Sequence, residues 1–346
     1  MTPGAQREIQ VPMKRAQRRL EDLNYTFDFR HRPVMEVEPG EPFALETEDA
    51  PSGSYRAPDD AARLLDAWYL NYSPPKANPV TGPVFVRGAD PGDTLIVQID
   101  RLEMDTQGVT YWRPGHKPLG DSLKWSDLSK PTLGIGRIEN GDVKMAEAAT
   151  WEDGRVVRHP IDLSVRQSPF VGTIGVAPER EVETSVLGQG TWGGNMDVRD
   201  ICPGTRVLLP CYHKGALLYV GDVHACQGDT EFYGTAMEVR ATVTLHCEVT
   251  KHSQMPFVRL QTDTSIVSVA CARPLEEAVL RASVQLMEWL VHEYGCSQRQ
   301  AYLLVGVNPD FRMNVYQMAP IGKLQYTVGA EILKASLPKG MARAGP

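Results

Sequence analysis

The sequence predicts a mainly β fold of the α+β type, in which a β-sandwich or barrel core carries an attached α/β portion. Two observations favour this fold. Glycine and proline account for 30 and 26 of the 346 residues, and they separate short apolar runs in the way that frequent turns separate short strands. A single long amphipathic segment, near residues 274–293, predicts a helix late in the chain, which is typical of a helical subdomain attached to a β structure.

The strands are predicted from short apolar runs and from the alternation of apolar with polar residues. The clearest alternation places Val239, Ala241 and Val243 on one face and Glu238 and Arg240 on the other. A period of two indicates a strand with one buried face and one solvent-exposed face. The predicted strands cover residues 94–99, 206–209, 216–220 and 238–248.

The long helix is predicted from apolar residues that recur every three or four positions between residues 274 and 293. A proline in its first turn and Gly295 after its last turn are typical helix boundaries. A shorter helix is expected from its cap at Ser297 to Leu304. A third helix is a candidate at residues 58–69.

These elements divide the chain into four parts, and the second part carries both a long loop and the motifs of chemical interest. The loop is expected at residues 113–137, because that stretch is rich in Gly, Pro, Lys and Asp without a clear period. The four parts are an N-terminal extension (1–30), a β-rich sandwich or barrel (31–250, with catalytic motifs at 189–238), an α+β portion with the long helix (251–336) and a C-terminal tail (337–346).

Composition excludes several classes of function. Lys and Arg total 36 against 43 Asp and Glu, which gives a net charge of -7, and no basic run suits a phosphate backbone. No apolar stretch is long enough for a membrane span, and no secretory signal is visible. The six cysteines form no CxxC pair. We therefore expect a cytoplasmic protein without nucleic-acid or membrane partners.

The residues that suggest chemistry follow the strand at 216–220. If that strand continues, Asp222 and His224 point the same way, because residues two apart on a strand share a face. Asn195 and Asp197 stand in the same relation, after paired glycines that allow close approach of the backbone. Asp197, Asp222 and His224 would together provide three ligands and leave an open position, which describes a hydrolytic zinc site.

A turn at residues 227–229 would bring Glu231 back toward the same mouth. A carboxylate at that place is suited to moving protons during amide hydrolysis. The residues alone leave simpler interpretations open: His224 as a hydrogen-bonded structural histidine, Asp222 as a turn residue, and Glu231 as an exposed strand-edge charge.

Several motifs together resemble the acetamidase/formamidase family. The strongest are GNMD and GDVHACQGDTE, which lie within the stretch just described, and the resemblance covers roughly residues 30 to 335. The matching segments are NPVTGP (78–83), GADPGD (88–93), PFVGTIGVAP (169–178), GNMD (194–197), GDVHACQGDTE (221–231) and the helix with Ala301-Tyr302.

The resemblance implies a β-rich sandwich and barrel with an α/β portion, and a metal-associated, homo-oligomeric amidase. The implied reaction is hydrolysis of the C–N bond of a small linear amide, of formamide or acetamide type, to a carboxylate and ammonia by metal-activated water. The metal would be zinc, with calcium as the alternative. The implied ligands are Asp197, Asp222 and His224, and Glu231 and Asp229 are the expected catalytic residues.

Asn195 and Gln227 are expected to contact the substrate. Two positions differ from the family pattern: Thr230 stands where a glycine is usual, and Gly193 stands where a polar or basic residue often precedes Gly194. Two alternatives therefore stay open. One is hydrolysis of a bulkier or cyclic amide, a urea or a carbamate, and the other is a non-catalytic β-sandwich that binds a small molecule and holds a structural cation such as Ca²⁺.

Overall fold

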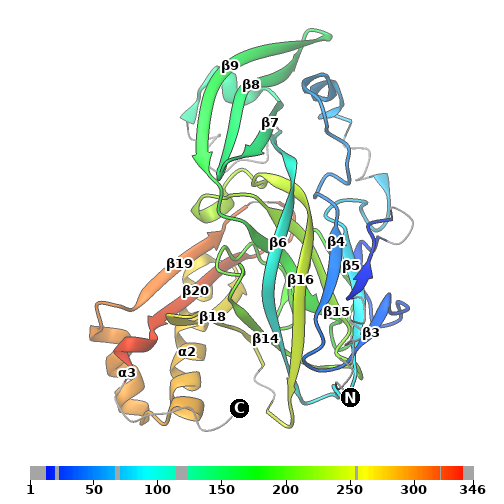
Figure 1. The fold of residues 1–346 in the computed structure, drawn as a ribbon. Coiled ribbons are helices and arrows are strands. Elements are labelled where there is room, and N and C mark those ends of the chain that lie inside the picture. Colours follow the sequence, from blue (N-terminus) through cyan, green and yellow to red (C-terminus); the bar gives the residue numbers. More distant parts are fainter. Residues whose placement is uncertain are drawn as a thin grey trace, which may run out of the picture.

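A computed structural model describes residues 13–19, 23–66, 71–113, 123–253, 256–319 and 321–337. Within them, one connected and largely antiparallel sheet of 18 strands curls around the core (Figure 1), and β2 (Thr26–Phe27) and β11 (Glu183–Thr184) form a separate pair. The predicted mainly β fold is confirmed. The 18 strands are β1 (Lys14–Ala16), β3 (Met35–Val37), β4 (Phe43–Thr47), β5 (Val80–Val86), β6 (Thr94–Trp112), β7 (Thr132–Glu139), β8 (Asp142–Glu152), β9 (Arg155–Arg166), β10 (Phe170–Val176), β12 (Gln189–Gly190), β13 (Gly193–Asn195), β14 (Arg206–Pro210), β15 (Leu218–His224), β16 (Glu238–Thr250), β17 (Val258–Gln261), β18 (Ser265–Ala272), β19 (Arg312–Gln317) and β20 (Tyr326–Leu333).

The centre of the sheet is the long antiparallel pair of β6 and β16 (Figure 1), and β16 also pairs with β4 and β15. The predicted alternation in β16 is present: Val239, Val243 and Leu245 are fully buried, and Arg240 and Thr244 are partly exposed. Glu238 departs from it. This residue was expected on the exposed face and is instead buried, because the first residue of β16 pairs with His224 of β15.

Strands β7, β8 and β9 form an antiparallel extension beyond one end of β6 (Figure 1). The expected loop at 113–137 is therefore partly wrong. Residues 114–122 lie outside the described part, Ser126–Ser129 form a short 3₁₀ helix, and Thr132 begins β7. The N-terminal extension also contributes to the sheet, because β1 pairs in parallel with β4.

The helical part is as predicted: α2 (Leu275–Tyr294) lies beside strands β18 and β20, and α3 (Gln298–Val307) lies next to α2 (Figure 1). The buried face of α2 packs against these strands through Leu286, Trp289 and Leu290. Gly295 ends α2 in the left-handed conformation, and Ser297 caps α3 by accepting a hydrogen bond from the Gln300 backbone N–H.

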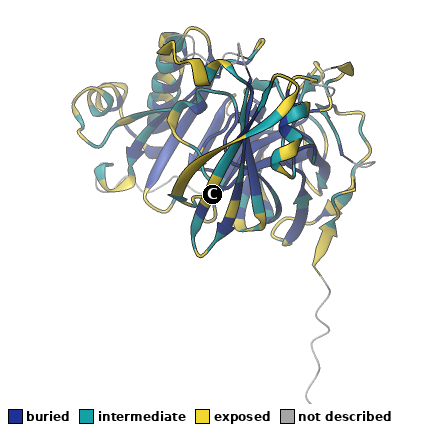
Figure 2. Ribbon diagram, turned by 90° about the horizontal axis from the view of Figure 1, so that it is seen from above, coloured by how far each residue is buried: buried dark blue, intermediate teal, exposed yellow. Residues whose placement is uncertain are grey.

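The third helix candidate, at 58–69, is a 3₁₀ helix over Pro58–Arg63, and its last three residues lie outside the described part. Figure 2 shows the buried residues concentrated on the strands, with the exposed ones on turns and outer helix faces. In the described part of the chain, none of the helices combines the length and apolar character that a bilayer crossing needs.

Candidate functional site

The end of β15 places a carboxylate and an imidazole on one side of the sheet. Asp222 and His224 are both buried, and His224 Nε2 lies 3.2 Å from Asp222 Oδ1. His224 stands opposite Phe170 of β10 on one side and Glu238 of β16 on the other. Its Nε2 lies 3.1 Å from Glu238 Oε2. The strand periodicity thus brings together the expected pair and adds a third group from the neighbouring strand.

These atoms are close without being aligned as hydrogen bonds. Asp197 Oδ1, Asp222 Oδ1, His224 Nε2 and Glu238 Oε2 are all buried and have no hydrogen-bond partner in the described part of the chain. One ligand atom from each of Asp197, Asp222 and His224 lies within 4.8 Å of the other two. Converging acceptors without a donor are the arrangement that a bound cation satisfies.

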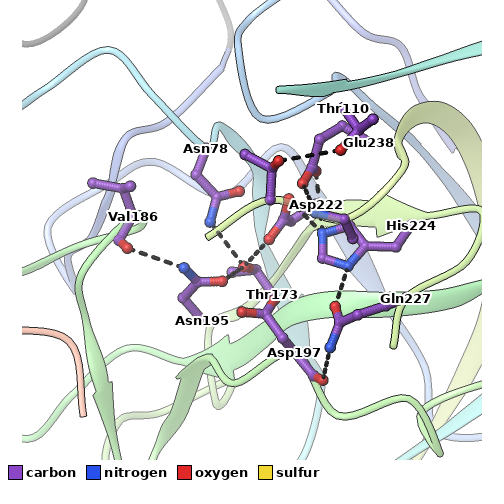
Figure 3. A network of polar contacts seen from close by, with 12 residues as sticks. Asn78, Thr110, Thr173, Val186, Asn195, Asp197, Asp222, His224, Gln227 and Glu238 are labelled. Atoms are coloured by element: carbon purple, nitrogen blue, oxygen red, sulfur yellow. Dashed lines mark hydrogen bonds and ion pairs between the residues drawn. The ribbon is translucent and has the colours of Figure 1, made fainter. Parts of the chain in front are cut away.

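Gln227 determines which nitrogen of His224 faces this cluster. Its amide nitrogen donates to the backbone carbonyls of Asp197 (3.2 Å) and Tyr316 (3.1 Å), which fixes the orientation of the amide. Its Oε1 therefore accepts from His224 Nδ1, 2.9 Å away. In the neutral ring this leaves the lone pair of Nε2 directed at Asp222 and Glu238, as a metal-ligating histidine requires (Figure 3).

Asp197 enters the cluster from the segment after β13. Its Oδ2 accepts a hydrogen bond from Gln317 Nε2, and Gln317 in turn accepts one from Gln189 Nε2 at 3.0 Å. An added Cβ at Gly172 would lie 2.7 Å from Asp197 Oδ1 and 2.8 Å from the Asp222 carbonyl. Only glycine at position 172 lets the strand pass this close to both residues.

Glu231 is buried beside Asp197, in the 3₁₀ turn Asp229–Glu231. A second group of potential ligand atoms, on His224, Glu231 and Glu238, also lies within 4.8 Å. Three of the acidic residues have positive φ, with values of 51° at Asp197, 55° at Asp222 and 39° at Glu231. Such conformations cost free energy and gather at functional sites.

The electrostatics of the cluster are dominated by buried negative charge. Burial, together with neighbouring carboxylates, raises the pKa of Asp197 to about 7 and of Glu238 to about 8, and the pKa of Glu231 well above its usual value. Burial disfavours the imidazolium, but Glu238 and Asp222 outweigh it and raise the pKa of His224. Without a cation the site therefore retains protons on several of its groups.

A small cavity of about 110 Å³ opens onto the cluster. It has room for several water molecules. Asp197, Asp222, Glu231 and Glu238 form its acidic wall. The remaining wall is mostly apolar or aromatic and includes Ala77, Tyr111, Trp112, Val186, Tyr233, Ala319, Ile321 and Leu324.

The other expected site residues have different surroundings. Asn195 lines the cavity, but its Nδ2 donates to the Val186 carbonyl (3.0 Å) and its Oδ1 accepts from Thr173 (2.9 Å). Both polar atoms of the Gln227 side chain are hydrogen-bonded within the protein, Oε1 to His224 and Nε2 to two backbone carbonyls. Asp229 is not brought to the cluster, because its exposed carboxylate pairs with Arg199.

Two residues of the cluster were missed from the sequence. Glu238 was assigned to the exposed face of its strand, and Gln317 lies 120 positions from the aspartate that it contacts. The position of Glu238 opposite His224 depends on the pairing of two strands, and the local sequence holds no signal of it. Gln317 had no such signal either.

The backbone favours glycine at both positions that depart from the family pattern, which explains Gly193 but not Thr230. Thr230 has a φ of 75°, in the left-handed region where glycine is favoured and a β-branched residue is strained. Gly193 has a φ of 100°, and an added Cβ would lie 2.3 Å from the Ile174 carbonyl. With this backbone, position 193 accommodates only glycine.

Comparisons with known proteins point to one family. A sequence profile of the Acetamidase/Formamidase family matches residues 25–189 and 185–315. The structure is similar to an acetamidase from Bacillus halodurans, with a TM-score of 0.76 and 30% identity, covering 90% of this chain and 95% of that one. It is also similar to an acetamidase from Yersinia enterocolitica, with a TM-score of 0.75 and 29% identity, covering 92% and 91%.

A curated relative, an acetamidase from Mycolicibacterium smegmatis, is 23% identical over 261 residues, which is 62% of this chain and 63% of that protein. The chain spans about three fifths of the length of the curated relatives it matches. The solved structures extend the similarity to nearly the whole chain.

Proposed function

The chain belongs to the acetamidase/formamidase family, and from this premise we propose that it hydrolyses the C–N bond of a small linear amide to a carboxylate and ammonia. The observation that carries the proposal is the convergence of Asp197 Oδ1, Asp222 Oδ1 and His224 Nε2, all buried and without a hydrogen-bond partner among the described residues, beside a small cavity that the two aspartates line. Unpaired buried atoms of this kind destabilise a folded core, whereas a bound cation in a hydrolase would pair with all of them.

A divalent cation fits these residues, and Asp197, Asp222 and His224 are its proposed ligands. Two carboxylates and one imidazole suit zinc, with calcium as the alternative. When bound, such a cation polarises an amide carbonyl and makes water more acidic. The net charge of the site also favours it, because four buried carboxyl groups (Asp197, Asp222, Glu231 and Glu238) face one imidazole.

Glu231 is the proposed proton carrier. It lines the cavity, and burial and the neighbouring Asp197 raise its pKa, so it takes up a proton more readily than an ordinary carboxylate does. Glu231 would take a proton from the attacking water and deliver it to the departing nitrogen, so that ammonia leaves. Asp229 has no proposed role, because its carboxylate is exposed and paired with Arg199.

Substrate size follows from the cavity. Its volume of about 110 Å³ and its apolar wall favour a short aliphatic amide over a bulky or cyclic one. Asn195 and Gln227 have their polar atoms engaged in the protein, so we assign them to holding the site in place instead of binding the substrate.

The proposal is tested by measuring ammonia release from formamide, acetamide and larger amides, together with elemental analysis of the purified protein. We expect short amides to be hydrolysed, one divalent metal per chain, and loss of activity on chelation that the metal restores. Full turnover by protein shown to hold no metal would refute the role of the cation. Absence of hydrolysis with metal bound would instead favour a binding module with a structural ion.

We further propose zinc as the metal, a homo-oligomer and a cytoplasmic location. The six cysteines carry no disulfide, in keeping with a reducing compartment. Elemental analysis tests the first proposal, sedimentation of the purified protein the second, and cell fractionation the third.

A further inference from the structure

Asn78 is held in one orientation at the edge of the candidate site. Its side chain is 2% exposed, and its Nδ2 donates to Thr173 Oγ1 (3.1 Å) and to the Ser185 carbonyl (3.3 Å). A backbone carbonyl can only accept hydrogen bonds, so the amide nitrogen must face Ser185. The Oδ1 atom must therefore face the other way.

The Oδ1 atom of Asn78 is buried and has no donor within the described residues. Figure 3 shows the amide group reaching toward the cluster, close to Asp222 and Thr173, and Asn78 lines the cavity. An unpaired buried carbonyl costs free energy. A cost of this kind persists where a bound molecule supplies the missing partner.

The missing partner is a hydrogen-bond donor, and the proposed substrate carries one. The other unpaired acceptors along the cavity are the carboxylates of Asp197, Asp222 and Glu238, which suit a cation. Among the cavity-lining residues that the structure describes, Asn78 contributes the one buried, unpaired oxygen of an uncharged side chain. A primary amide whose carbonyl faces the cation still has two N–H groups that need an acceptor.

We propose that Asn78 Oδ1 accepts a hydrogen bond from the N–H group of the substrate amide, so that Asn78 selects primary amides over esters with the same acyl group. This inference rests on the proposed function. Its physical basis is that a buried acceptor built to receive an N–H is left unpaired by an analogue that lacks one, and that this penalises the analogue.

The experiment replaces Asn78 by glycine, because glycine removes the side chain and tolerates the positive φ. Acetamide and methyl acetate are compared, with the ester followed as a substrate or, where it is not turned over, as a competitor of acetamide. For acetamide, kcat/KM should fall about ten- to hundredfold, the effect of losing one buried hydrogen bond. The value for the ester should change far less, and the metal content should stay at the wild-type level.

Asn24→Gly is the matched control. Asn24 Nδ2 donates to the carbonyl of Gly82 at 2.6 Å, and Gly82 lies four residues after Asn78. Asn24 itself does not line the cavity. This variant should lower stability and leave the amide-to-ester ratio unchanged. If Asn78→Gly lowers kcat/KM equally for acetamide and the ester, or loses its metal, the inference is overturned. Amide hydrolysis by the wild type would still support the proposed function in that case. A wild-type protein that hydrolyses no amide would overturn both.

Discussion

At the scale of single residues, the site is defined by groups whose partners are missing. Asp197, Asp222, His224 and Glu238 each present a buried acceptor without a donor, although each also has another atom held by hydrogen bonds or packing. One atom of each residue is thus fixed by the protein and another is available. This division is what a preorganised ligand set requires, because the ligands pay no ordering cost when the cation binds.

Glu231→Gln should separate proton transfer from metal binding. The amide is nearly isosteric with the carboxylate and cannot accept the proton, so we expect folding and metal content near wild type and turnover lower by roughly a hundredfold to ten-thousandfold. Turnover and elemental analysis measure the two quantities. If Glu231→Gln loses metal but regains normal turnover when metal is resupplied, Glu231 is a ligand together with His224 and Glu238, the second group found here.

His224→Ala should behave differently. It removes Nε2, the proposed ligand atom that Gln227 turns toward the cluster, so metal and activity should be lost together. The same elemental analysis reports this, and circular dichroism checks that the fold remains. A His224→Ala protein that keeps its full metal content would show that the cation is held elsewhere.

Thr230→Gly should stabilise the protein. Threonine at a φ of 75° carries a left-handed strain that glycine lacks, and the expected gain is about 1 kcal/mol, reduced by the greater freedom of glycine in the unfolded chain. Urea unfolding measures it. The matched control is Thr244→Gly on the exposed face of β16, where glycine should destabilise the strand. A loss of stability at position 230 equal to that at 244 would contradict the account.

At the scale of elements, the sequence predicted the strands and helices that local patterns determine. It missed the features that depend on packing between residues far apart in the chain. The pairing of Asp222 with His224 followed from strand period, and helix α2 from its apolar spacing. Strand β7 was missed because Gly134 and Gly136 resemble loop composition. Glycine is needed at these positions because methionine side chains occupy the space that a Cβ atom would take. An added Cβ at Gly136 would lie 2.8 Å from Met237 Sδ.

Gly172→Ala tests whether β10 must pass this close to the cluster. The added methyl group would lie 2.7 Å from Asp197 Oδ1, so either the strand or the carboxylate must move. We expect weaker metal binding and a fall in turnover, with the overall fold kept. Metal affinity and circular dichroism measure these. Gly306→Ala in α3, where an added Cβ meets no atom within 4 Å, should instead be stabilising by about 0.5–1 kcal/mol and leave metal binding unchanged.

At the scale of the whole molecule, the candidate site joins parts of the chain that are far apart in sequence. Strand β19, from the helix-bearing portion, contributes the Gln317 side chain to Asp197, and its Tyr316 carbonyl receives Gln227. Just after this strand, the backbone N–H of Met318 donates to the Thr230 carbonyl at 2.6 Å. Strand β19 therefore completes the site from a distant part of the same sheet, and cation binding should stabilise these contacts.

This coupling predicts how stability depends on pH and on the metal. The raised pKa values of Asp197, Glu231, Glu238 and His224 mean that the metal-free folded chain holds more protons than the unfolded chain between about pH 5 and 8. Its stability should therefore fall as the pH rises through this range. The lowered pKa of Asp222 acts in the opposite direction, but only at more acidic pH.

Metal-free protein should lose several kcal/mol between pH 6 and pH 8, since each extra proton that the folded chain holds lowers stability by about 1.4 kcal/mol per pH unit. A bound cation replaces the retained protons, so one equivalent of zinc should raise Tm more at pH 8 than at pH 6. Thermal unfolding with and without metal measures both effects.

Glu238→Gln removes one of the titrating groups, so its metal-free form should show a weaker pH dependence than the wild type. Stability of the metal-free wild type that is constant or rises over this range would contradict the raised pKa values of the cluster.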